Sequence, residues 1–552
     1  MVFQKLRCSK AMLRIVAVAA ISFAIVGTSY GQSVTWMRTS SGGDKNKVQT
    51  LTFHPTGTAA TATVTINPSQ TYQTMTGFGG SFTEAGAVSL KTLNATVRKQ
   101  ATDAYFGPTG ANYSVCRSQI GASDFSAGLY SYDDQAGDNA LNNFSVQHDV
   151  TSTLIQWEKD ALANNPDLKI FGSPWSAPAW MKQMDNGVPQ SMDNGGTLLP
   201  SCATAWANYF VKYVQAYKAQ GVPIWGITIQ NEPQAKQTWP SMIFSATQER
   251  DFMKNSLGPI LAQNNLGPTV LNVMFWDHNK DVMVDWANTF YADATVKAMV
   301  WGEAIHWYSG DAFNNVATVY NNYPGKHILA TEQCITNFTG AIDYANTAEK
   351  YAHDIFGDIV NGSEGWVDWN MVLNTQGGPN VSSNWCLAGI LVNTTAGTIQ
   401  FTPIYYYMVQ FSKYVRPGAV RIGATVSGGS GLEVMGFKNP DASMTAIVHN
   451  SGNTTISGRL VSGTQQVEFS TTALSVETFT WNATVPVVKN TIVSSLSKAD
   501  IAKRRIILNQ AQQQQIPGAG MFTVTGKKLS GSVSRVSTGI YVDKPDQNSQ
   551  SK

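Results

Sequence analysis

Short apolar runs rich in β-branched residues alternate with helical segments over the central part of the chain, and the alternation occurs eight times. Strands separated in this way by amphipathic helices are typical of parallel sheets with helical crossovers. The clearest helix is predicted over 203–219, where Trp206, Phe210, Val214 and Tyr217 fall on one stripe. The eight predicted strands are 75–79, 113–120, 168–171, 224–229, 270–275, 299–305, 327–331 and 366–372.

Eight strand–helix units over residues 73–414 predict an α/β fold, a (β/α)8 TIM barrel with insertions. An open doubly wound sheet is the alternative for the same alternation of elements. That fold would be expected to carry a phosphate loop or a dinucleotide fingerprint, and neither motif occurs in this sequence. The barrel is therefore the favoured interpretation.

The segments before and after this central region have the alternating apolar and polar pattern that is typical of half-buried strands. Residues 48–53 and 60–66 alternate apolar side chains with Thr, so 32–72 is predicted to supply N-terminal strands. Residues 415–485 contain short, turn-bounded strands that indicate a β-sandwich, and we expect the N-terminal strands to pair with it. The predicted C-terminal strands are 420–422, 432–437, 444–448, 458–461, 466–470 and 475–480.

The first 31 residues have the pattern of a secretory signal peptide. Four basic residues precede a short apolar run over 15–26, and the small residues Ser29 and Gly31 stand at −3 and −1 before Gln32. The sequence therefore predicts secretion to the extracellular space or the cell surface, in a bacterium. No later stretch is long and apolar enough for a bilayer span, so no integral membrane segment is expected.

The C-terminal region, 486–552, differs in composition from the rest. It combines a basic segment with a Gln-rich spacer over 510–515. Its last part resembles the C-terminal sorting segments of some bacterial secreted enzymes, and a linker with one β-hairpin is the alternative.

Composition adds three constraints. A length of 552 residues predicts two or three domains, and fifteen Trp side chains suit either a large core or the stacking of sugar rings. The formal net charge of +2 includes four basic residues of the signal and ten Lys or Arg against three Asp after 485, so the body is acidic. An acidic body argues against nucleic acid as a partner. The sequence sets no oligomeric state.

Four cysteines follow the predicted signal, which itself contains Cys8. Their spacing lacks the CxxC pattern of structural zinc sites, so buried free thiols are expected, although four cysteines also allow three disulfide pairings. The four are Cys116, Cys202, Cys334 and Cys386.

Polar or aromatic residues follow the carboxyl ends of most predicted barrel strands. In a TIM barrel these ends form one face, where catalysis takes place. A single residue of this kind at a strand end is weak evidence, but a series of them on one rim predicts an active site. The series comprises Asp124, Trp175, Asn231, Glu232, His306, Glu332 and Asn374.

Two carboxyl groups in this series suit glycoside hydrolysis with retention of configuration. That reaction needs one carboxylic acid to protonate the leaving oxygen and one carboxylate to attack the anomeric carbon. Glu232 and Glu332 each follow an apolar strand, and Asn231 is placed to donate its amide to a sugar 2-hydroxyl. We expect the ionised Glu332 to raise the pKa of Glu232. The mechanism needs no metal and no organic cofactor.

Seven motifs, in this order along the chain, resemble glycoside hydrolase family 30, the glucosylceramidase-like family, over residues 75–422. They are GFGGSFTEAG, SDFS, GSPWSAPAWMK, QNEP, AIHWY, ATEQC and WVDWNMVLNTQGGPN. The resemblance implies a retaining (β/α)8 barrel with an attached β-sandwich, Glu232 as acid/base and Glu332 as nucleophile. It further implies substrate contacts from Asp124, Trp175, Asn231, His306, Tyr308, Trp369 and Asn380.

Several of these residues have structural alternatives. Asp124 could cap a turn, Trp175 and Trp369 could be barrel core, and His306 could be a hydrogen-bonded structural histidine. We interpret Glu84 as a packing residue at a helix start and Glu303 as part of helix packing. Whether 277–279 lines the rim is left open.

Three functions follow from these features. The first is a retaining β-glucosidase of the glucosylceramidase type that cleaves a β-linked glucose from a carbohydrate substrate. The second is an endo-β-1,6-glucanase or a xylanase of the same family. The third, from another class, is a carbohydrate-binding protein without catalysis, which the presence of both glutamates disfavours.

Overall fold

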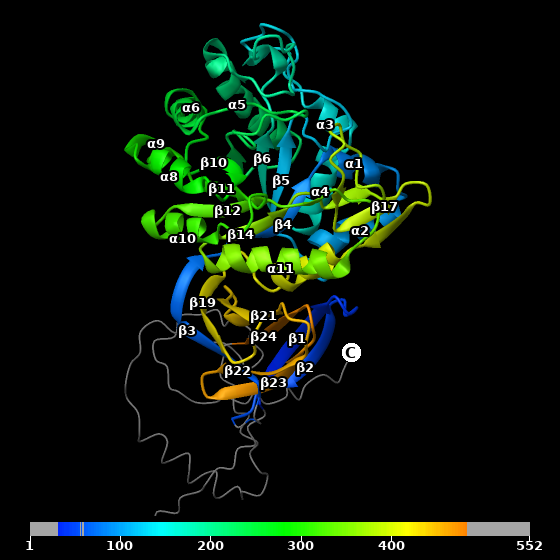
Figure 1. The fold of residues 1–552 in the computed structure, drawn as a ribbon. Coiled ribbons are helices and arrows are strands. Elements are labelled where there is room, and N and C mark those ends of the chain that lie inside the picture. Colours follow the sequence, from blue (N-terminus) through cyan, green and yellow to red (C-terminus); the bar gives the residue numbers. More distant parts are fainter. Residues whose placement is uncertain (1–30, 56, 58–59, 483–552) are drawn as a thin grey trace, which may run out of the picture. The chain divides into compact units, whose positions relative to one another are not determined.

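The computed structural model describes residues 31–55, 57 and 60–482. Eight parallel strands form a closed barrel in the order β10-β11-β12-β14-β4-β5-β6-β9 (Figure 1). Each predicted barrel strand is present, so the TIM-barrel prediction is confirmed. The barrel strands are β4 (Gly77–Phe82), β5 (Val115–Ile120), β6 (Lys169–Pro174), β9 (Gly226–Thr228), β10 (Asn272–Asn279), β11 (Gly302–His306), β12 (His327–Glu332) and β14 (Gly365–Asp368).

Helices surround the barrel strands (Figure 1). The helix α5 covers Ala203–Ala219 as predicted, and its stripe from Trp206 to Tyr217 is buried. The others are α1 (Glu84–Lys91), α2 (Ala95–Phe106), α3 (Gln147–Thr151), α4 (Leu154–Asn164), α6 (Ala246–Phe252), α7 (Gly258–Gln263), α8 (Met283–Tyr291), α9 (Ala294–Met299), α10 (Phe313–Asn322), α11 (Tyr344–Val360) and α12 (Pro403–Ser412), with a π-helical turn over Met253–Leu257.

The lower part of the barrel interior is a packed apolar layer. Because side chains alternate across a strand, the inward positions of each strand are two residues apart. This layer fills the barrel interior below the carboxyl ends of the strands. Polar side chains can therefore point into the barrel only from the inward positions that follow the layer along each strand. Its buried members are Val115, Phe171, Met274, Ala304, Leu329 and Val367.

Nine strands form a second sheet in the order β2-β1-β24-β21-β20-β19-β3-β22-β23. The N-terminal strands pair with the C-terminal ones, as expected, and the ends of the sheet meet because His54 and Gln466 exchange backbone hydrogen bonds of 3.0 and 2.9 Å. The folded sheet encloses its own core, which includes Trp36, Phe479 and Trp481. Its strands are β1 (Ser33–Ser40), β2 (Lys47–Thr52), β3 (Ala62–Thr74), β19 (Val420–Ser427), β20 (Leu432–Lys438), β21 (Ser443–Asn450), β22 (Ile456–Ser462), β23 (Gln465–Thr471) and β24 (Ser475–Asn482).

The predicted strand 366–372 is wrong at its carboxyl end. The barrel strand β14 ends at Asp368, and β15 (Val372–Asn374) belongs to a separate sheet, where it pairs with β17 (Ile390–Asn393). Apolar side chains continue across the break, so the pattern could not reveal it. Three small sheets were not predicted; their other strands are β7 (Lys182–Gln183), β8 (Thr197–Leu198), β13 (Ile335–Thr336), β16 (Cys386–Leu387) and β18 (Thr398–Phe401).

A buried histidine joins the second sheet to a barrel helix. His449 on β21 contacts Glu349 of α11 through Nε2 at 3.1 Å and Glu433 of β20 through Nδ1 at 2.8 Å. Burial lowers the pKa of His449, but the two carboxylates outweigh burial and raise the pKa to about 9. The contact is therefore charge-assisted at neutral pH.

All four cysteines of the body are buried free thiols, which confirms that expectation. Within residues 31–482, apart from the gaps at 56 and 58–59, no helix has the length and apolar character that a bilayer span requires. The predicted signal peptide and the predicted C-terminal segment lie outside the described residues.

A buried carboxyl group between α4 and β5 predicts a pH-dependent stability. Ser118 Oγ donates to Glu158 Oε1 at 2.5 Å, and burial raises the pKa of Glu158 to about 8 although this hydrogen bond opposes the rise. A raised folded-state pKa contributes stability at low pH, and the contribution is lost as pH rises from about 4.5 through 8.

We therefore expect wild-type protein to lose stability relative to Glu158→Gln between pH 5 and pH 9, at about 1.4 kcal/mol per unit of pKa shift. Melting temperatures of both proteins across this range would measure the effect. Parallel curves for the two proteins would contradict a raised pKa.

Candidate active site

The polar side chains at the top of the barrel follow directly from strand alternation. Side chains alternate along a strand, so the residue two positions after each apolar member of the packed layer also points into the barrel, at the carboxyl end of its strand. Arg117 follows Val115 in this way, Thr331 follows Leu329, and Trp369 follows Val367. The same alternation places Ser173 beyond Phe171 and His306 beyond Ala304. The strand register thus gathers these side chains at one end of the barrel.

Arg117 lies at the centre of this end and is fully buried. Its guanidinium donates to Ser173 Oγ at 2.9 Å, to Asp277 Oδ2 at 2.6 Å, to Asn231 Oδ1 at 2.8 Å and to Glu332 Oε2. Since a guanidinium can only donate, the oxygen of Asn231 must face Arg117, and its NH₂ group is left to donate elsewhere.

A bulge in β10 delivers Asp277 into the barrel. Trp276 and Asp277 have positive φ angles of 73° and 51°, and the register with β11 shifts between Trp276 and His278. Such bulges re-aim a side chain and are frequent beside active sites. Asp277 thereby contacts Arg117 and accepts from Thr228 at 2.7 Å and from Thr331 at 2.6 Å.

Glu232 is held in an unfavourable backbone conformation in the turn that follows β9, four residues beyond its last residue. Its φ of +45° is rare for a residue with a Cβ and costs about 1–3 kcal/mol. The ends of the neighbouring strands hold the turn in place: Glu232 N donates to Asp277 O at 3.0 Å, and Asn231 N donates to Pro174 O at 2.8 Å. The carboxyl group therefore has a fixed position at the barrel end.

Glu332 ends β12 and is oriented by two donors. Tyr308 donates its hydroxyl to Oε1 at 2.9 Å, and Arg117 donates to Oε2. The Glu332 side chain is 7% exposed and that of Glu232 is 15% exposed, so both carboxyl groups can be reached from solvent.

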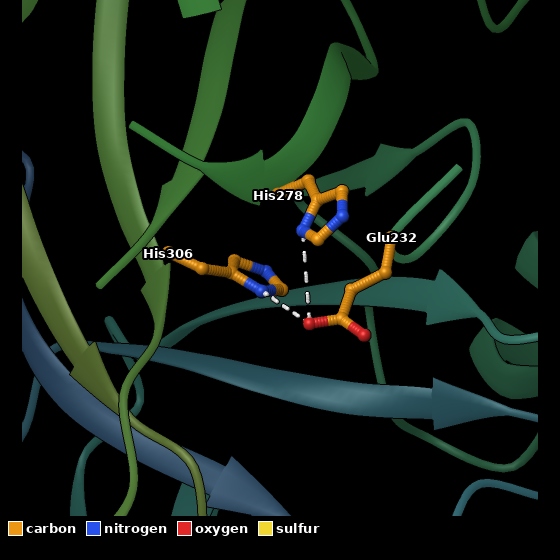
Figure 2. A group of neighbouring side chains, drawn as sticks. All are labelled: Glu232, His278 and His306. Atoms are coloured by element: carbon orange, nitrogen blue, oxygen red, sulfur yellow. Dashed lines mark ion pairs between the residues drawn. The ribbon is translucent and has the colours of Figure 1, made fainter. Parts of the chain in front are cut away.

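His306 brings the two carboxyl groups to one point. Figure 2 shows its ion pair with Glu232. The His306 Nδ1 lies 3.5 Å from Glu232 Oε1 and 4.0 Å from Glu332 Oε1. The two carboxylate oxygens are therefore no further apart than the sum of these distances. The other ring nitrogen, Nε2, contacts Asp277 Oδ1 at 3.0 Å, which orients the ring.

The electrostatics of this group differ from the sequence-based expectation. Burial raises the pKa of Glu232, but His306, His278 and Arg117 outweigh it and leave the pKa below its usual value. Burial likewise raises the pKa of Glu332, and the charges of His306 and Arg117 reduce that rise without reversing it. The expectation that Glu332 keeps the pKa of Glu232 high is therefore wrong for the free enzyme.

The proton that Glu232 lacks is held by the neighbouring His306. Burial lowers the pKa of His306, but the negative charges of Glu332, Asp277 and Glu232 raise it to about 9. At neutral pH the Glu232–His306 pair thus carries one proton, placed on the imidazole. His306 is hydrogen-bonded to Asp277 through Nε2, as a structural histidine would be, and its Nδ1 also contacts both carboxylates.

Two tryptophans lie beneath the guanidinium. Trp175 and Trp369 stack with ring centroids 4.9 Å apart, and Arg117 lies 4.6 Å and 5.3 Å above their rings. Both tryptophans are almost fully buried, and they line the carboxylate end of the barrel from the β6 and β14 sides.

Asp124 lies at the edge of the site and is 4% exposed. Burial, with the charges of Glu332 and Glu232, raises the pKa of Asp124 to about 8. Asn384 donates to its Oδ2 at 3.3 Å, whereas Oδ1 has no partner among the described protein atoms. Asp124 therefore has an oxygen available for a ligand hydroxyl.

The loop after β15 brings Asn380 to the same edge. Val381 N donates to Asp124 O at 3.0 Å, and the Asn380 Oδ1 accepts from Ser382 N at 3.2 Å. The Asn380 Nδ2 is buried and lacks a partner within the described part of the chain. Asn374, also on the predicted rim, instead accepts from Gln376 N and Gly378 N within this loop.

The two other glutamates lie apart from the carboxylate pair. Glu84 is the first residue of α1, where it accepts from Ala127 N at 3.0 Å and contacts His148 at 2.8 Å. Glu303 is fully buried on β11, and its burial, with the charge of Glu249 on α6, raises its pKa well above the usual range.

Four residues of the site were missed or left open by sequence reasoning. Asp277 and His278 follow the fifth strand, and the rim position alone gave a signal for them. Arg117 gave none, because a charged residue within a predicted strand is usually on its exposed face. Asn384 lies ten residues beyond β15, in a loop whose path no periodic pattern indicates.

Removal of the Arg117 charge should destabilise the protein strongly. Arg117→Met leaves Asp277 and Glu332 buried without their cation, and breaking a buried pair costs about 3–5 kcal/mol. Urea denaturation of the variant would measure the loss. The control is Arg250→Met, which removes a partly exposed pair with Asp251 and should cost about 0–1 kcal/mol. Equal losses in the two variants would contradict this account.

Comparison with known proteins assigns both domains of the chain to one family. The model of the glycosyl hydrolase family 30 TIM-barrel domain matches residues 75–415, and that of the family 30 beta sandwich domain matches 418–479. A Caenorhabditis elegans protein provisionally named glucosylceramidase 4 is 36% identical over 436 residues, which cover 76% of this chain and 82% of the relative.

Two further relatives are named as endo-glucanases. An endo-1,6-β-D-glucanase of Aspergillus fumigatus is 34% identical over 402 residues, 69% of this chain and 79% of that protein. A solved structure of an endo-β1,6-glucanase superposes with a TM-score of 0.76 and 28% identity, covering 82% of this chain and all of that one. The family models and these relatives show that the chain belongs to glycosyl hydrolase family 30 and is a glycoside hydrolase.

Proposed function

We propose that the protein is a retaining β-glucosidase, with Glu332 as nucleophile and Glu232 as general acid/base. The observation that carries the proposal is the position of both carboxyl groups within 4.0 Å of one imidazole nitrogen, His306 Nδ1. Two carboxyl groups this close together can act on a single anomeric carbon, and the upper limit on their separation, the sum of the two distances to Nδ1, is compatible with the separation of about 5–5.5 Å that retention requires.

The surroundings of Glu332 suit a nucleophile. Arg117 and Tyr308 each hold one carboxylate oxygen, which fixes the direction of attack and balances the negative charge. In the first step Glu332 attacks the anomeric carbon, the glycosidic bond breaks, and a covalent glycosyl-enzyme forms. Asn231 has its NH₂ group free to donate to the 2-hydroxyl of the sugar in the transition state.

The surroundings of Glu232 suit a group that first donates a proton as an acid and later accepts one as a base. The proton of the Glu232–His306 pair reaches the leaving oxygen through Glu232, and the alcohol departs. Esterification of Glu332 then removes one of the charges that raise the pKa of His306. Glu232 next takes a proton from water, which attacks the anomeric carbon and releases the sugar.

The substrate proposed is a β-linked terminal glucose. Similarity to proteins named glucosylceramidase supports glucose as the sugar. Val381 and Asn384 both donate to Asp124, so the loop after β15 lies against the edge of the site where outer hydroxyls would bind, which favours exo-acting cleavage of a terminal residue. The predicted export of the chain supports an extracellular oligosaccharide over a membrane lipid.

An endo-β-1,6-glucanase is the second candidate. Identities of 34% and 28% to proteins named for that activity support it. Both functions use the same carboxylate pair, and they differ in whether an internal linkage of a polymer can enter the site.

A panel of p-nitrophenyl β-glucoside, gentiobiose, cellobiose, pustulan, laminarin, xylan and glucosylceramide would test the proposal, with Glu332→Ala as the inactive control. The proposed function predicts release of glucose from the β-glucosides and no short oligosaccharides from pustulan. Oligosaccharides from pustulan would favour the endo-glucanase, and hydrolysis of xylan alone would contradict glucose as the sugar.

A further inference from the structure

Two imidazoles and one carboxylate converge on the acid/base side of the active site. The His278 Nδ1 lies 3.7 Å from Glu232 Oε1, and His306 Nδ1 lies 3.5 Å from the same oxygen (Figure 2). One donor atom from each of the three residues lies within 4.8 Å of both others. We refer to Glu232, His278 and His306 as the two-histidine cluster.

A metal ion could bind the donor atoms of this cluster in place of the proton that the Glu232–His306 pair holds. The Nδ1 atoms of His278 and His306 are both buried, and neither makes a hydrogen bond to another described residue. His306 is fully buried, so its Nδ1 is directed into the protein, toward Glu232, and not to bulk solvent. The contacts of the two Nδ1 atoms with Glu232, at 3.7 and 3.5 Å, are longer than ordinary hydrogen bonds, and a metal ion would give both nitrogens a closer partner.

The spacing suits a small tetrahedral ion. Zinc bonds of about 2.0–2.1 Å to nitrogen and oxygen place neighbouring donors roughly 3.3 Å apart in a tetrahedral site. The two distances to Glu232 Oε1 are within half an ångström of that spacing. Two histidines and one carboxylate are also the donor set of many three-ligand zinc sites, in which water is the fourth ligand.

The residue behind His306 provides the outer support that such sites use. Its Nε2 contacts Asp277 Oδ1 at 3.0 Å, and a carboxylate on the far nitrogen orients a ligating histidine and makes it a stronger donor. Asp277 is in turn fixed by Arg117 and Thr331. His306 is thus already in the orientation that binding would require.

We propose that the two-histidine cluster is a binding site for a divalent transition-metal ion such as Zn²⁺, and that the bound ion inhibits the enzyme. The His278 and Glu232 side chains are 13% and 15% exposed, which gives the ion a path from solvent. The ion would occupy the oxygen that carries the catalytic proton, so the inhibitory effect rests on the proposed role of Glu232. Binding itself does not depend on that role.

Zinc titration of the metal-free full chain by isothermal calorimetry, without substrate, tests the binding. We expect one Zn²⁺ ion per chain in the wild type and at least roughly tenfold weaker binding in His278→Gln. The matched control is His353→Gln, because His353 is an exposed histidine that also contacts a carboxylate, Asp311 Oδ2 at 2.9 Å. Its zinc affinity should equal that of the wild type.

Thermal melting gives a second readout that shows whether each variant is folded. Zinc that binds the native state should raise the melting temperature of the wild type and of His353→Gln, but not that of His278→Gln. Magnesium and calcium, which prefer oxygen ligands, should not shift it. Equal zinc binding by wild type and His278→Gln, or none by the wild type, would overturn the site.

Activity assays separate the two parts of the proposal. Zinc should lower kcat/KM of the wild type, a chelator should restore it, and His353→Gln should behave in the same way. Zinc bound at the cluster without loss of hydrolysis would overturn the inhibitory role. Absence of hydrolysis in metal-free enzyme would instead count against the proposed function and leave the calorimetric result intact.

Discussion

Glu332→Gly is expected to lower kcat by roughly 10⁴-fold or more, because the variant lacks the proposed nucleophile. The loss should be in kcat more than in KM, since the expected substrate contacts of Trp175, Asp124 and Asn231 are retained in the variant. Hydrolysis of p-nitrophenyl β-glucoside by purified variant and wild type measures it. The cavity left by the side chain lies beside Arg117 and Tyr308, both of which donate to Glu332 in the wild type.

Sodium azide should restore activity to Glu332→Gly in a diagnostic way. Azide can enter the vacated space and attack the anomeric carbon directly, so the expected product is the α-glucosyl azide. Glu332→Gln is the matched control, because its amide fills the same space and should block rescue. A β-glucosyl azide, or an unrescued variant with more than about a hundredth of wild-type activity, would contradict the role of Glu332.

Glu232→Ala is expected to give the second-largest effect, and one that depends on the leaving group. With gentiobiose, whose leaving alcohol needs a proton, kcat/KM should fall by roughly 10²- to 10⁴-fold. With 2,4-dinitrophenyl β-glucoside, whose leaving group needs none, the first step should be nearly unchanged. Steady-state kinetics on the two substrates measures the difference.

The same variant should accumulate its covalent intermediate, because no base then activates water. Azide, which needs no base, should speed its breakdown and give the β-glucosyl azide. The opposite azide configurations expected for Glu232→Ala and Glu332→Gly assign the two roles separately. An equal loss of kcat/KM with the aryl and the sugar leaving groups would indicate a general disturbance of the site. It would contradict the role of Glu232 as acid/base.

The barrel could be predicted because its strands and helices have different hydrophobic periods. Buried parallel strands are short apolar runs, and the stripe of α5 repeats with the period of a helix, so each element had its own signature. Glu232 and Glu332 could be placed on one rim for the same reason: each directly follows such a run, and the fold brings all strand ends together.

The centre of the site could not be predicted from such patterns. Arg117 is charged but points into the barrel, where its cost is offset by Asp277 and Glu332, residues that are far away in sequence. Asp277 reaches the interior only through the bulge in β10, and a positive φ at Trp276 has no signature in the sequence. The contact of Asn384 with Asp124 likewise depends on a loop path.

The protonation of Glu232 shows the consequence of missing these residues. Two carboxylates alone would raise each other's pKa, which was the sequence-based expectation. With Arg117, His278 and His306 present, positive charge outweighs that effect at Glu232, and the proton resides on His306. The common position of the two carboxyl groups could be inferred from sequence, but their titration depends on neighbours that only the fold brings together.

The most direct test of the account is the anomeric form of the first glucose released, followed by proton NMR immediately after enzyme is added to a β-glucoside in D₂O. A covalent intermediate on Glu332, opened by water that Glu232 activates, predicts β-glucose first and α-glucose only later, through mutarotation. Initial release of α-glucose would mean a single displacement by water, and would contradict the pairing of Glu332 as nucleophile with Glu232 as acid/base.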